Sequence, residues 1–208
     1  MNIWTKLAMY SFYETERLYF RPFFFTDVDD FHALASDPEN LQFIFPTQAS
    51  IEESQYALAN YFMKSPLGIW AICDKKAQKM IGAIKFEKLD EIRKEAEIGY
   101  FLRKDYWSQG YMTEAVIKLR DLSMDQFELK QLSIVTHLEN SASQKVAQKS
   151  GFVLYRRFKG SDRYTRKMRD YLEFRYTKGE LNEQTPRNFS LCRRITSRKT
   201  SQRSKYFK

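Results

Sequence analysis

The sequence predicts an α/β (α+β) fold in which a mixed sheet of about seven strands is flanked by helices. Short apolar runs of strand length alternate with segments of helical periodicity, in the order β-α-α-β-β-β-α-β-α-β-β. Hydrophobic residues form 43% of the 208 residues and aromatic residues 16%, which is enough for a sizeable core and excludes full disorder.

The N-terminal segment predicts one strand and two helices. Residues 17–24 (RLYFRPFF) are aromatic and β-prone, and Pro22 among them indicates an edge strand. Thr26 is expected to cap a helix with an acidic first turn, which ends before Pro38. Ser50 is expected to cap the second helix.

The middle of the chain predicts three strands. Residues 68–73 (GIWAIC) and 80–86 (MIGAIKF) flank a polar turn, which is typical of a hairpin. Residues 95–102 (EAEIGYFL) alternate in polarity, and a loop over 103–110 follows them.

The remaining segments alternate between helix and strand. Apolar residues at helical spacing predict a helix over residues 111–127, before a strand over 131–138. A short helix over 141–149 then precedes strands over 151–158 and about 167–176.

The net charge of +9 comes mostly from the C-terminus. Residues 183–208 hold eight basic side chains and one acidic one, so the first 182 residues carry only +2. We therefore expect one domain over 1–182 and a basic tail over 183–208. Three roles of the tail stay open: a solvated extension, a contact with RNA or the ribosome, and a contact between copies in a homodimer.

Several classes of protein are not expected. Cys73 and Cys192 lie far apart and only two histidines are present, so we expect neither a disulfide framework nor a metal site. No apolar run approaches the ~20 residues of a membrane span, and the N-terminus makes a poor signal peptide. We expect a soluble, cytoplasmic protein with no membrane contact.

The segment from Glu95 to Thr113 combines a strand, a glycine-containing loop and a helix start. The first amides of a helix lack intrahelical acceptors and lie at its positive end, so they suit a phosphate group. Gly110 lets backbone approach a ligand closely, and Thr113 can add a hydroxyl group. A single glycine before a helix is also typical of a plain turn, and this alternative stays open on spacing alone.

The motifs EIGYFL (97–102), YWSQGYMTEA (106–115) and ENSASQKVAQKSGF (139–152) resemble, in order and spacing, the GNAT superfamily of N-acetyltransferases. The RimJ/RimL-like branch is the most similar, since its first strand and helix resemble ETERLYFRPFFFTDVDDF (14–31) and its end resembles MRDYLEF (168–174). The resemblance covers about residues 14–178.

The resemblance implies a GNAT fold with splayed central strands that hold acetyl-CoA as co-substrate. Met112 stands where the family usually has Gly or Ala, and a side chain larger than these would hinder close approach of the diphosphate unless it points away. The positions implied to bind the cofactor are Tyr100, Phe101, Leu102, Ser108, Gln109, Gly110, Tyr111, Met112, Thr113, Asn140 and Ser143.

The implied reaction moves an acetyl group from the thioester directly to a primary amine. Many relatives protonate the departing thiolate with a tyrosine, but Ala147 occupies that position, and Ser143 matches the serine used in the RimL-like branch. Glu97 is the first candidate for the general base. A helix-capping role for Ser143 and a structural ion pair for Glu97 stay open, while Glu114 and His137 are expected to be structural.

The acceptor is expected to be a protein N-terminal α-amine or a small-molecule amine. At pH 7 an α-amine is roughly 10–15% neutral and a lysine amine about 0.04% neutral, so the α-amine demands less of a base. The alternative is a catalytically weak acetyl-CoA-binding or ribosome/RNA-associated module, suggested by Met112, Ala147 and the basic tail.

Overall fold

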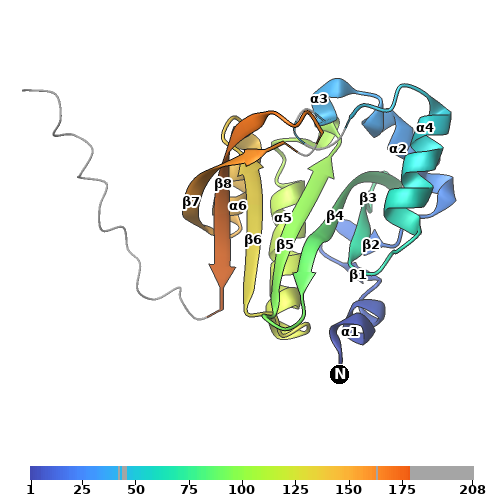
Figure 1. The fold of residues 1–208 in the computed structure, drawn as a ribbon. Helices are drawn as coiled ribbons and strands as arrows, with labels where there is room; N and C mark the ends of the chain where they lie inside the picture. Colours follow the sequence, from blue (N-terminus) through green and yellow to red (C-terminus); the bar gives the residue numbers. More distant parts are fainter. Residues whose placement is uncertain (42, 44–45, 163, 179–208) are drawn as a thin grey trace, which may run out of the picture. The chain divides into compact units, whose positions relative to one another are not determined.

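The computed structural model describes residues 1–41, 43, 46–162 and 164–178 (Figure 1). These residues form one mixed sheet of eight strands in the order β1-β2-β3-β4-β5-β6-β8-β7. The strands are β1 (Tyr13–Glu14), β2 (Leu18–Arg21), β3 (Ile69–Asp74), β4 (Lys79–Asp90), β5 (Glu95–Leu102), β6 (Gln131–His137), β7 (Val153–Ser161) and β8 (Met168–Thr177). The predicted fold class is confirmed, and the additional strand is β1, which is too short to show alternation.

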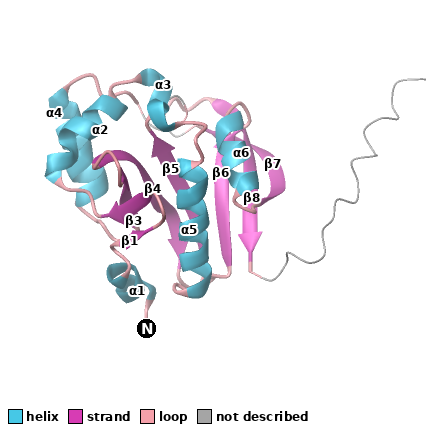
Figure 2. Cartoon of the chain, turned by 180° about the vertical axis from the view of Figure 1, so that it is seen from behind, coloured by secondary structure: helices cyan, strands magenta, loops and turns pink. Residues whose placement is uncertain are grey.

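Helices cover both faces of the sheet. The α-helices are α1 (Ile3–Met9), α2 (Val28–Ala35), α3 (Pro38–Leu41), α4 (Ile51–Ala57), α5 (Tyr111–Asp125) and α6 (Ser141–Lys149). The shorter turns are the 3-10 segments η1 (Phe25–Asp27) and η3 (Lys104–Tyr106), and the π-helical segment η2 (Leu58–Met63) continues α4. Figure 2 shows α5 and α6 lying across one face of the sheet.

Strand β3 shows how alternation produces two cores. Trp70 and Ile72 join the cluster that includes α5 and α6, whereas Ala71 and Cys73 join the cluster that includes α2 and η2. Successive side chains of a strand point to opposite faces, so one strand supplies both layers. All four residues are at most 1% exposed, which places this strand at the centre of the protein.

The N-terminal strand and helix differ from the prediction. The strand predicted over 17–24 is β2, which ends at Arg21 and lies between β1 and β3 rather than at the edge. Pro22 has no N–H to donate to a ladder, which explains the end of the strand. The prediction that Thr26 caps the helix is wrong, because η1 begins at Phe25 and the Asp27 carboxylate accepts the amide of Phe24 at 2.8 Å.

The central strands β5 and β6 separate, as the resemblance implied. Their parallel pairing covers only three residue pairs and ends at Glu97 and Ser133. Beyond that point β5 stays paired with β4 as far as Leu102, and β6 stays paired with β8 as far as His137. Figure 1 shows the two strands diverging toward their carboxyl ends.

Some expectations fall outside the described residues. The domain boundary at 182, the basic tail 183–208 and Cys192 lie there, so they stay predictions. Across the described part of the chain, no helix has both the length and the apolar character needed to cross a bilayer. The same residues contain no cluster of three or more His, Cys, Asp or Glu side chains suited to a metal ion.

The ion pair between Arg21 and Asp27 gives a test of the N-terminal packing. Both guanidinium Nη atoms contact the carboxylate, at 2.6 and 2.7 Å, and the Asp27 side chain is 6% exposed. We expect Asp27→Asn to lower the free energy of unfolding by about 3 kcal/mol, because it leaves the Arg21 charge buried without its partner. Urea denaturation measures the change.

The matched control is Asp125→Asn, which removes a carboxylate from the exposed pair with Lys178. Exposed pairs contribute roughly 0–1 kcal/mol, so this variant should unfold close to the wild type. Equal losses in the two variants would contradict the role assigned to the buried pair.

Candidate active site

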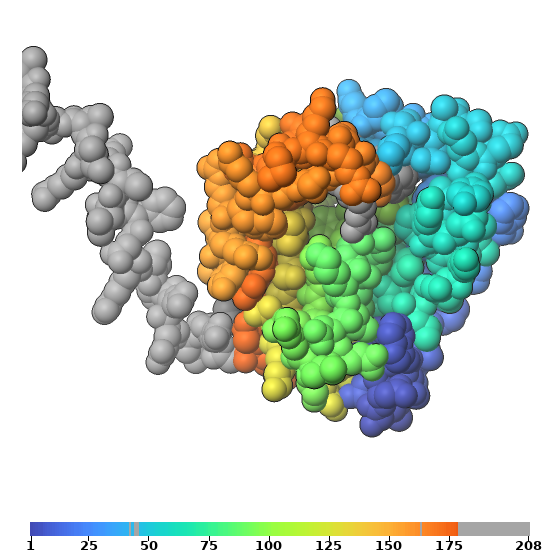
Figure 3. Space-filling model, viewed as in Figure 1, coloured from blue at the N-terminus to red at the C-terminus, as the bar shows by residue number. Residues whose placement is uncertain are grey.

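A cavity of about 590 Å³ opens where β5 and β6 separate. Figure 3 shows the surface hollowed between the green strand β5 and the orange β7–β8 hairpin. The wall combines side chains from the segment after α3, from the bulge in β4, from both separating strands and from the hairpin. Residues that carry chemistry in this wall are Glu87, Lys88, Glu97, Tyr100, His137, Asn140, Ser143, Asp162 and Tyr171.

The loop between β5 and α5 has two residues in the left-handed region. Ser108 has φ of 60° and Gly110 has φ of 82°. Gly110 is the N-cap of α5, and no side chain caps the first turn. Hydrogen bonds within the loop stabilise it. The Trp107 indole donates to the Leu102 carbonyl and the Gln109 side-chain amide donates to the Asp105 carbonyl, both at 2.7 Å. The uncapped amides therefore sit on a fixed support.

The two residues that departed from the family pattern are both buried. Met112 is 6% exposed and belongs to the core beneath α5, so its side chain points away from the loop. Ala147 is fully buried on the inner face of α6, in the same core. Neither side chain occupies the opening between the strands.

Ser143 and Tyr100 meet across the opening. The Tyr100 hydroxyl, from β5, lies 2.9 Å from the Ser143 Oγ atom on α6 and also donates to the Ser143 carbonyl at 3.3 Å. Asn140 caps α6, since its Oδ1 atom accepts the Ser143 amide at 3.0 Å. Burial raises the pKa of Tyr100, although the Ser143 hydrogen bond opposes the shift. Tyr100 is thus a neutral donor that can orient the serine hydroxyl.

One wall of the cavity holds two carboxylates, each paired with a lysine. Glu97 on β5 is 19% exposed and its Oε2 atom lies 2.8 Å from Lys88 Nζ. Glu87, at the bulge in β4, lines the same wall and is paired with Lys85 at 3.1 Å. The ion pair with Lys88 is consistent with a structural role for Glu97. Its position in the cavity wall is consistent with a role as the general base.

The opposite wall holds a histidine among aromatic rings. The His137 ring lies 4.6 Å from the Tyr171 ring and 5.3 Å from the Phe43 ring, and its Nε2 atom is 3.6 Å from Asp162. Burial lowers the pKa of His137 although the Asp162 charge raises it, so the imidazole is neutral at pH 7. Asp162 was not foreseen from the sequence, because no motif marks it and its hairpin is far from β6 along the chain.

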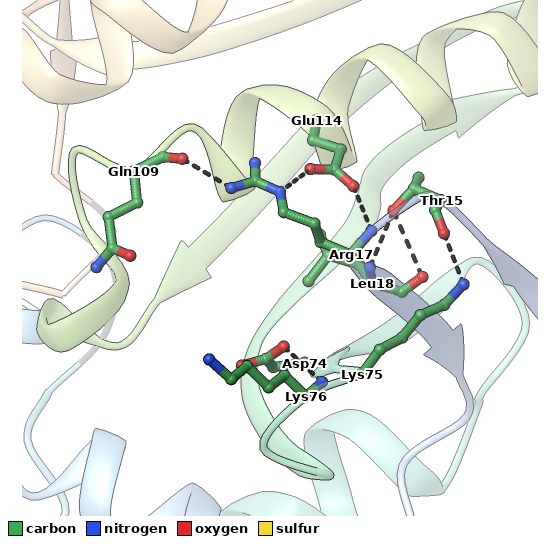
Figure 4. A network of polar contacts seen from close by, with 8 residues as sticks. All are labelled: Thr15, Arg17, Leu18, Asp74, Lys75, Lys76, Gln109 and Glu114. Carbon is green, nitrogen blue, oxygen red and sulfur yellow. Dashed lines mark hydrogen bonds and ion pairs between the residues drawn. The ribbon is translucent and has the colours of Figure 1, made fainter.

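Arg17 and Glu114 form a second group, outside the cavity but against the loop (Figure 4). The Glu114 carboxylate accepts from Arg17 Nε at 2.6 Å and from its backbone amide at 3.1 Å. The Arg17 Nη1 atom donates to the Gln109 carbonyl at 3.0 Å. The expectation of a structural Glu114 is consistent with these bonds, whereas the contact of Arg17 with the loop was missed.

Comparison with known proteins agrees with this geometry. The profile of the family described as "Acetyltransferase (GNAT) domain" matches residues 17–153. The uncharacterised N-acetyltransferase YoaA of Bacillus subtilis is 26% identical over 148 residues, which cover 69% of this chain and 84% of YoaA. The ribosomal-protein-serine acetyltransferase of Escherichia coli is 33% identical over 79 residues, 38% of this chain and 44% of its own.

Solved structures share the fold. A GNAT-family acetyltransferase from Bacillus anthracis aligns with a TM-score of 0.71 at 22% identity, covering 80% of this chain and 98% of that one. RimL, a ribosomal L7/L12 α-N-protein acetyltransferase solved with coenzyme A, aligns with a TM-score of 0.64 at 21% identity, covering 78% and 95%. With its profile matched over more than half of its length, the chain belongs to the GNAT family of acetyltransferases.

Proposed function

We propose that the protein transfers an acetyl group from acetyl-CoA to a primary amine, either a protein N-terminal α-amine or a small-molecule amine. The observation that carries the proposal is the opening between β5 and β6, which runs beside Tyr100, Ser143 and Glu97 within one cavity. RimL, which has the same fold, holds coenzyme A in its structure.

The residues around the opening fit the chemical parts of this co-substrate. The uncapped amides from Ser108 to Thr113 suit a diphosphate. Among the described residues, the edge of β5 that faces β6 has no strand partner from Ile98 to Tyr100, so its backbone can bind amide groups as an added strand would. Asn140 stands at the far side of the same opening, on the start of α6.

Two side chains are assigned to proton transfer. Attack of a neutral amine on the thioester carbon forms the C–N bond and breaks the C–S bond, so one proton leaves the nitrogen and one reaches the sulfur. Glu97 accepts the first proton and Ser143 donates the second. Tyr100 supports Ser143, because its hydroxyl lies 2.9 Å from Oγ, where either oxygen can donate, and the serine hydrogen is free to face the sulfur when Tyr100 is the donor.

Carboxylates in the walls can hold an amine acceptor. Glu87, Glu97 and Asp162 line the cavity and can accept hydrogen bonds from an ammonium group, while Lys85 and Lys88 offset the charges of the two glutamates. Once bound, the ammonium group must lose its proton, and an α-amine does so more readily than a lysine side chain. This supports α-amines and small amines of low pKa as acceptors.

The alternative, a weak acetyl-CoA binder or a ribosome/RNA-associated module, has lost part of its basis. Met112 and Ala147 suggested an impaired site, but both side chains lie in the core rather than in the opening. The basic tail 183–208 remains the argument for RNA contact. Comparing RNA binding by the full chain and by a chain without this segment tests it.

Glycine 110 tests the diphosphate assignment. An alanine there adds left-handed strain of about 1 kcal/mol, so Gly110→Ala should raise the Kd for CoA at most about fivefold, the limit reached if the free loop relaxes and binding must restore the strain. Gly110→Glu should raise it more than about 100-fold, because it adds a carboxylate beside a diphosphate. Space does not confound the comparison, since an added Cβ meets only the Arg17 Nη2 atom, at 3.5 Å. Calorimetry with equal affinities in both variants would overturn the assignment.

Ser143 tests the donor of the second proton. We expect Ser143→Ala to lower kcat about 100-fold and to change the Kd for CoA little. Tyr100 keeps the Ser143 carbonyl as a partner in this variant, so no buried hydroxyl loses its last hydrogen bond. Ser141→Ala, on the exposed start of the same helix, is the control and should keep full activity. Full turnover by Ser143→Ala would remove the role.

An amine panel tests the reaction itself. Release of the CoA thiol should accompany primary α-amines, with a lower kcat/KM at pH 7 for amines of lysine type. The matched control is each acceptor with its amine already acetylated, which should release none. Absence of thiol release with every amine, in a protein that binds CoA, would favour the binding module.

A further inference from the structure

Arg17 reaches the loop before α5 from a distant part of the chain. It lies in the turn between β1 and β2, 92 residues before Gln109 and 97 before Glu114. Its guanidinium group also lies over the ring of Tyr111, with 4.1 Å from its carbon to the ring centroid. Figure 4 shows the side chain extended between Glu114 and the Gln109 carbonyl. One side chain therefore contacts both sides of Gly110.

The bond to the Gln109 carbonyl fixes the next peptide group. The C=O of Gln109 and the N–H of Gly110 belong to one planar trans unit, in which they point in opposite directions. Because Arg17 holds the carbonyl at 3.0 Å, the Gly110 amide is directed away from Arg17. Without that bond, the glycine could rotate this unit at little steric cost.

Glu114 fixes Arg17 in turn. Its two oxygens accept from Arg17 Nε and from the Arg17 backbone amide, so both ends of the arginine are held. Burial raises the pKa of Glu114, but the hydrogen bond of Thr15 and the hydrogen bonds and charge of Arg17 outweigh it and the pKa is lowered, so the carboxylate is ionised at pH 7. The pair is thus neutral overall, and its effect on the loop is orientation more than charge.

We propose that Arg17 is a positioning residue for the diphosphate-binding loop: it holds the Gln109–Gly110 peptide in the orientation that presents the Gly110 amide to the co-substrate. The inference rests on the proposed use of acetyl-CoA. It assigns a function in co-substrate affinity to the turn between β1 and β2, which lies outside the cavity. A preorganised loop loses less conformational entropy on binding, so loss of Arg17 weakens affinity without changing the reacting groups.

The test compares two acetyl donors, acetyl-CoA and S-acetylpantetheine, which lacks the diphosphate and nucleotide. Arg17→Ala should raise the KM for acetyl-CoA about tenfold, the effect expected for loss of a charge-assisted hydrogen bond. The kcat/KM with S-acetylpantetheine should stay unchanged. Arg17→Lys should resemble Arg17→Ala, because an ammonium group cannot make the two-sided contact of a guanidinium group. An equal loss with both donors would indicate general damage and overturn the proposal.

Glu114→Gln separates orientation from charge. If Arg17 acts by orientation, the variant loosens the arginine and the KM for acetyl-CoA rises. If Arg17 acts by its charge alone, removal of the neutralising carboxylate lowers that KM, and the proposal fails. Lys76→Ala is the control, because it removes an exposed cation from the β3–β4 hairpin in the same region. Its KM should equal that of the wild type.

Failure of this inference differs from failure of the proposed function. A wild type that binds CoA normally, with no change in Arg17→Ala, overturns the role of Arg17 alone. A wild type that shows no heat of binding with CoA overturns both. If CoA binds but no amine is acetylated, the Kd values for CoA and for pantetheine are measured in place of the two KM values. Arg17→Ala should then raise the Kd for CoA about tenfold and leave the Kd for pantetheine unchanged.

Discussion

The constraint on which the site depends is the end of parallel pairing between β5 and β6 after three residue pairs. β5 stays paired with β4 and β6 stays paired with β8, so the sheet is continuous at the amino ends of β5 and β6 and opens toward their carboxyl ends. The opening leaves strand edge unpaired in the described part of β5, which is costly unless a ligand or water satisfies its polar groups. It also places Glu97 and Tyr100 of β5 and the start of α6 on either side of one cavity.

The opening is stable because the two strands are held from outside. β4 pairs with β5 along its length and β8 with β6 along its length, and the cluster beneath α5 joins side chains from both strands. Across the opening, the bond between Tyr100 and Ser143 links β5 to α6. The protein thus keeps a fixed gap in which electrostatic groups need little reorganisation when charge develops on the reacting atoms.

Local patterns in the sequence predicted most of the fold, because alternation and helical spacing report burial of nearby residues. The strand–loop–helix order pointed to Gly110, whereas Ser143 was assigned from the resemblance to the GNAT family. Local patterns failed where a distant partner decides the outcome. The turn after β2 follows the Arg21–Asp27 pair rather than a Thr26 cap, and neither Arg17 nor Asp162 stands out until folding brings it beside Gln109 or His137. An isolated arginine or aspartate has no periodicity to detect.

The placement of Arg17 shows how the N-terminal strands bear on chemistry that they do not touch. The carbonyl of Arg17 accepts the amide of Lys75 at 3.0 Å, and Lys75 Nζ donates to the Thr15 carbonyl at 2.7 Å (Figure 4). The turn is therefore anchored on the β3–β4 hairpin before its side chain reaches the loop. Loop order and ligand binding are linked equilibria. If the anchoring contacts favour binding of a ligand by a given free energy, the bound ligand stabilises those contacts by the same free energy.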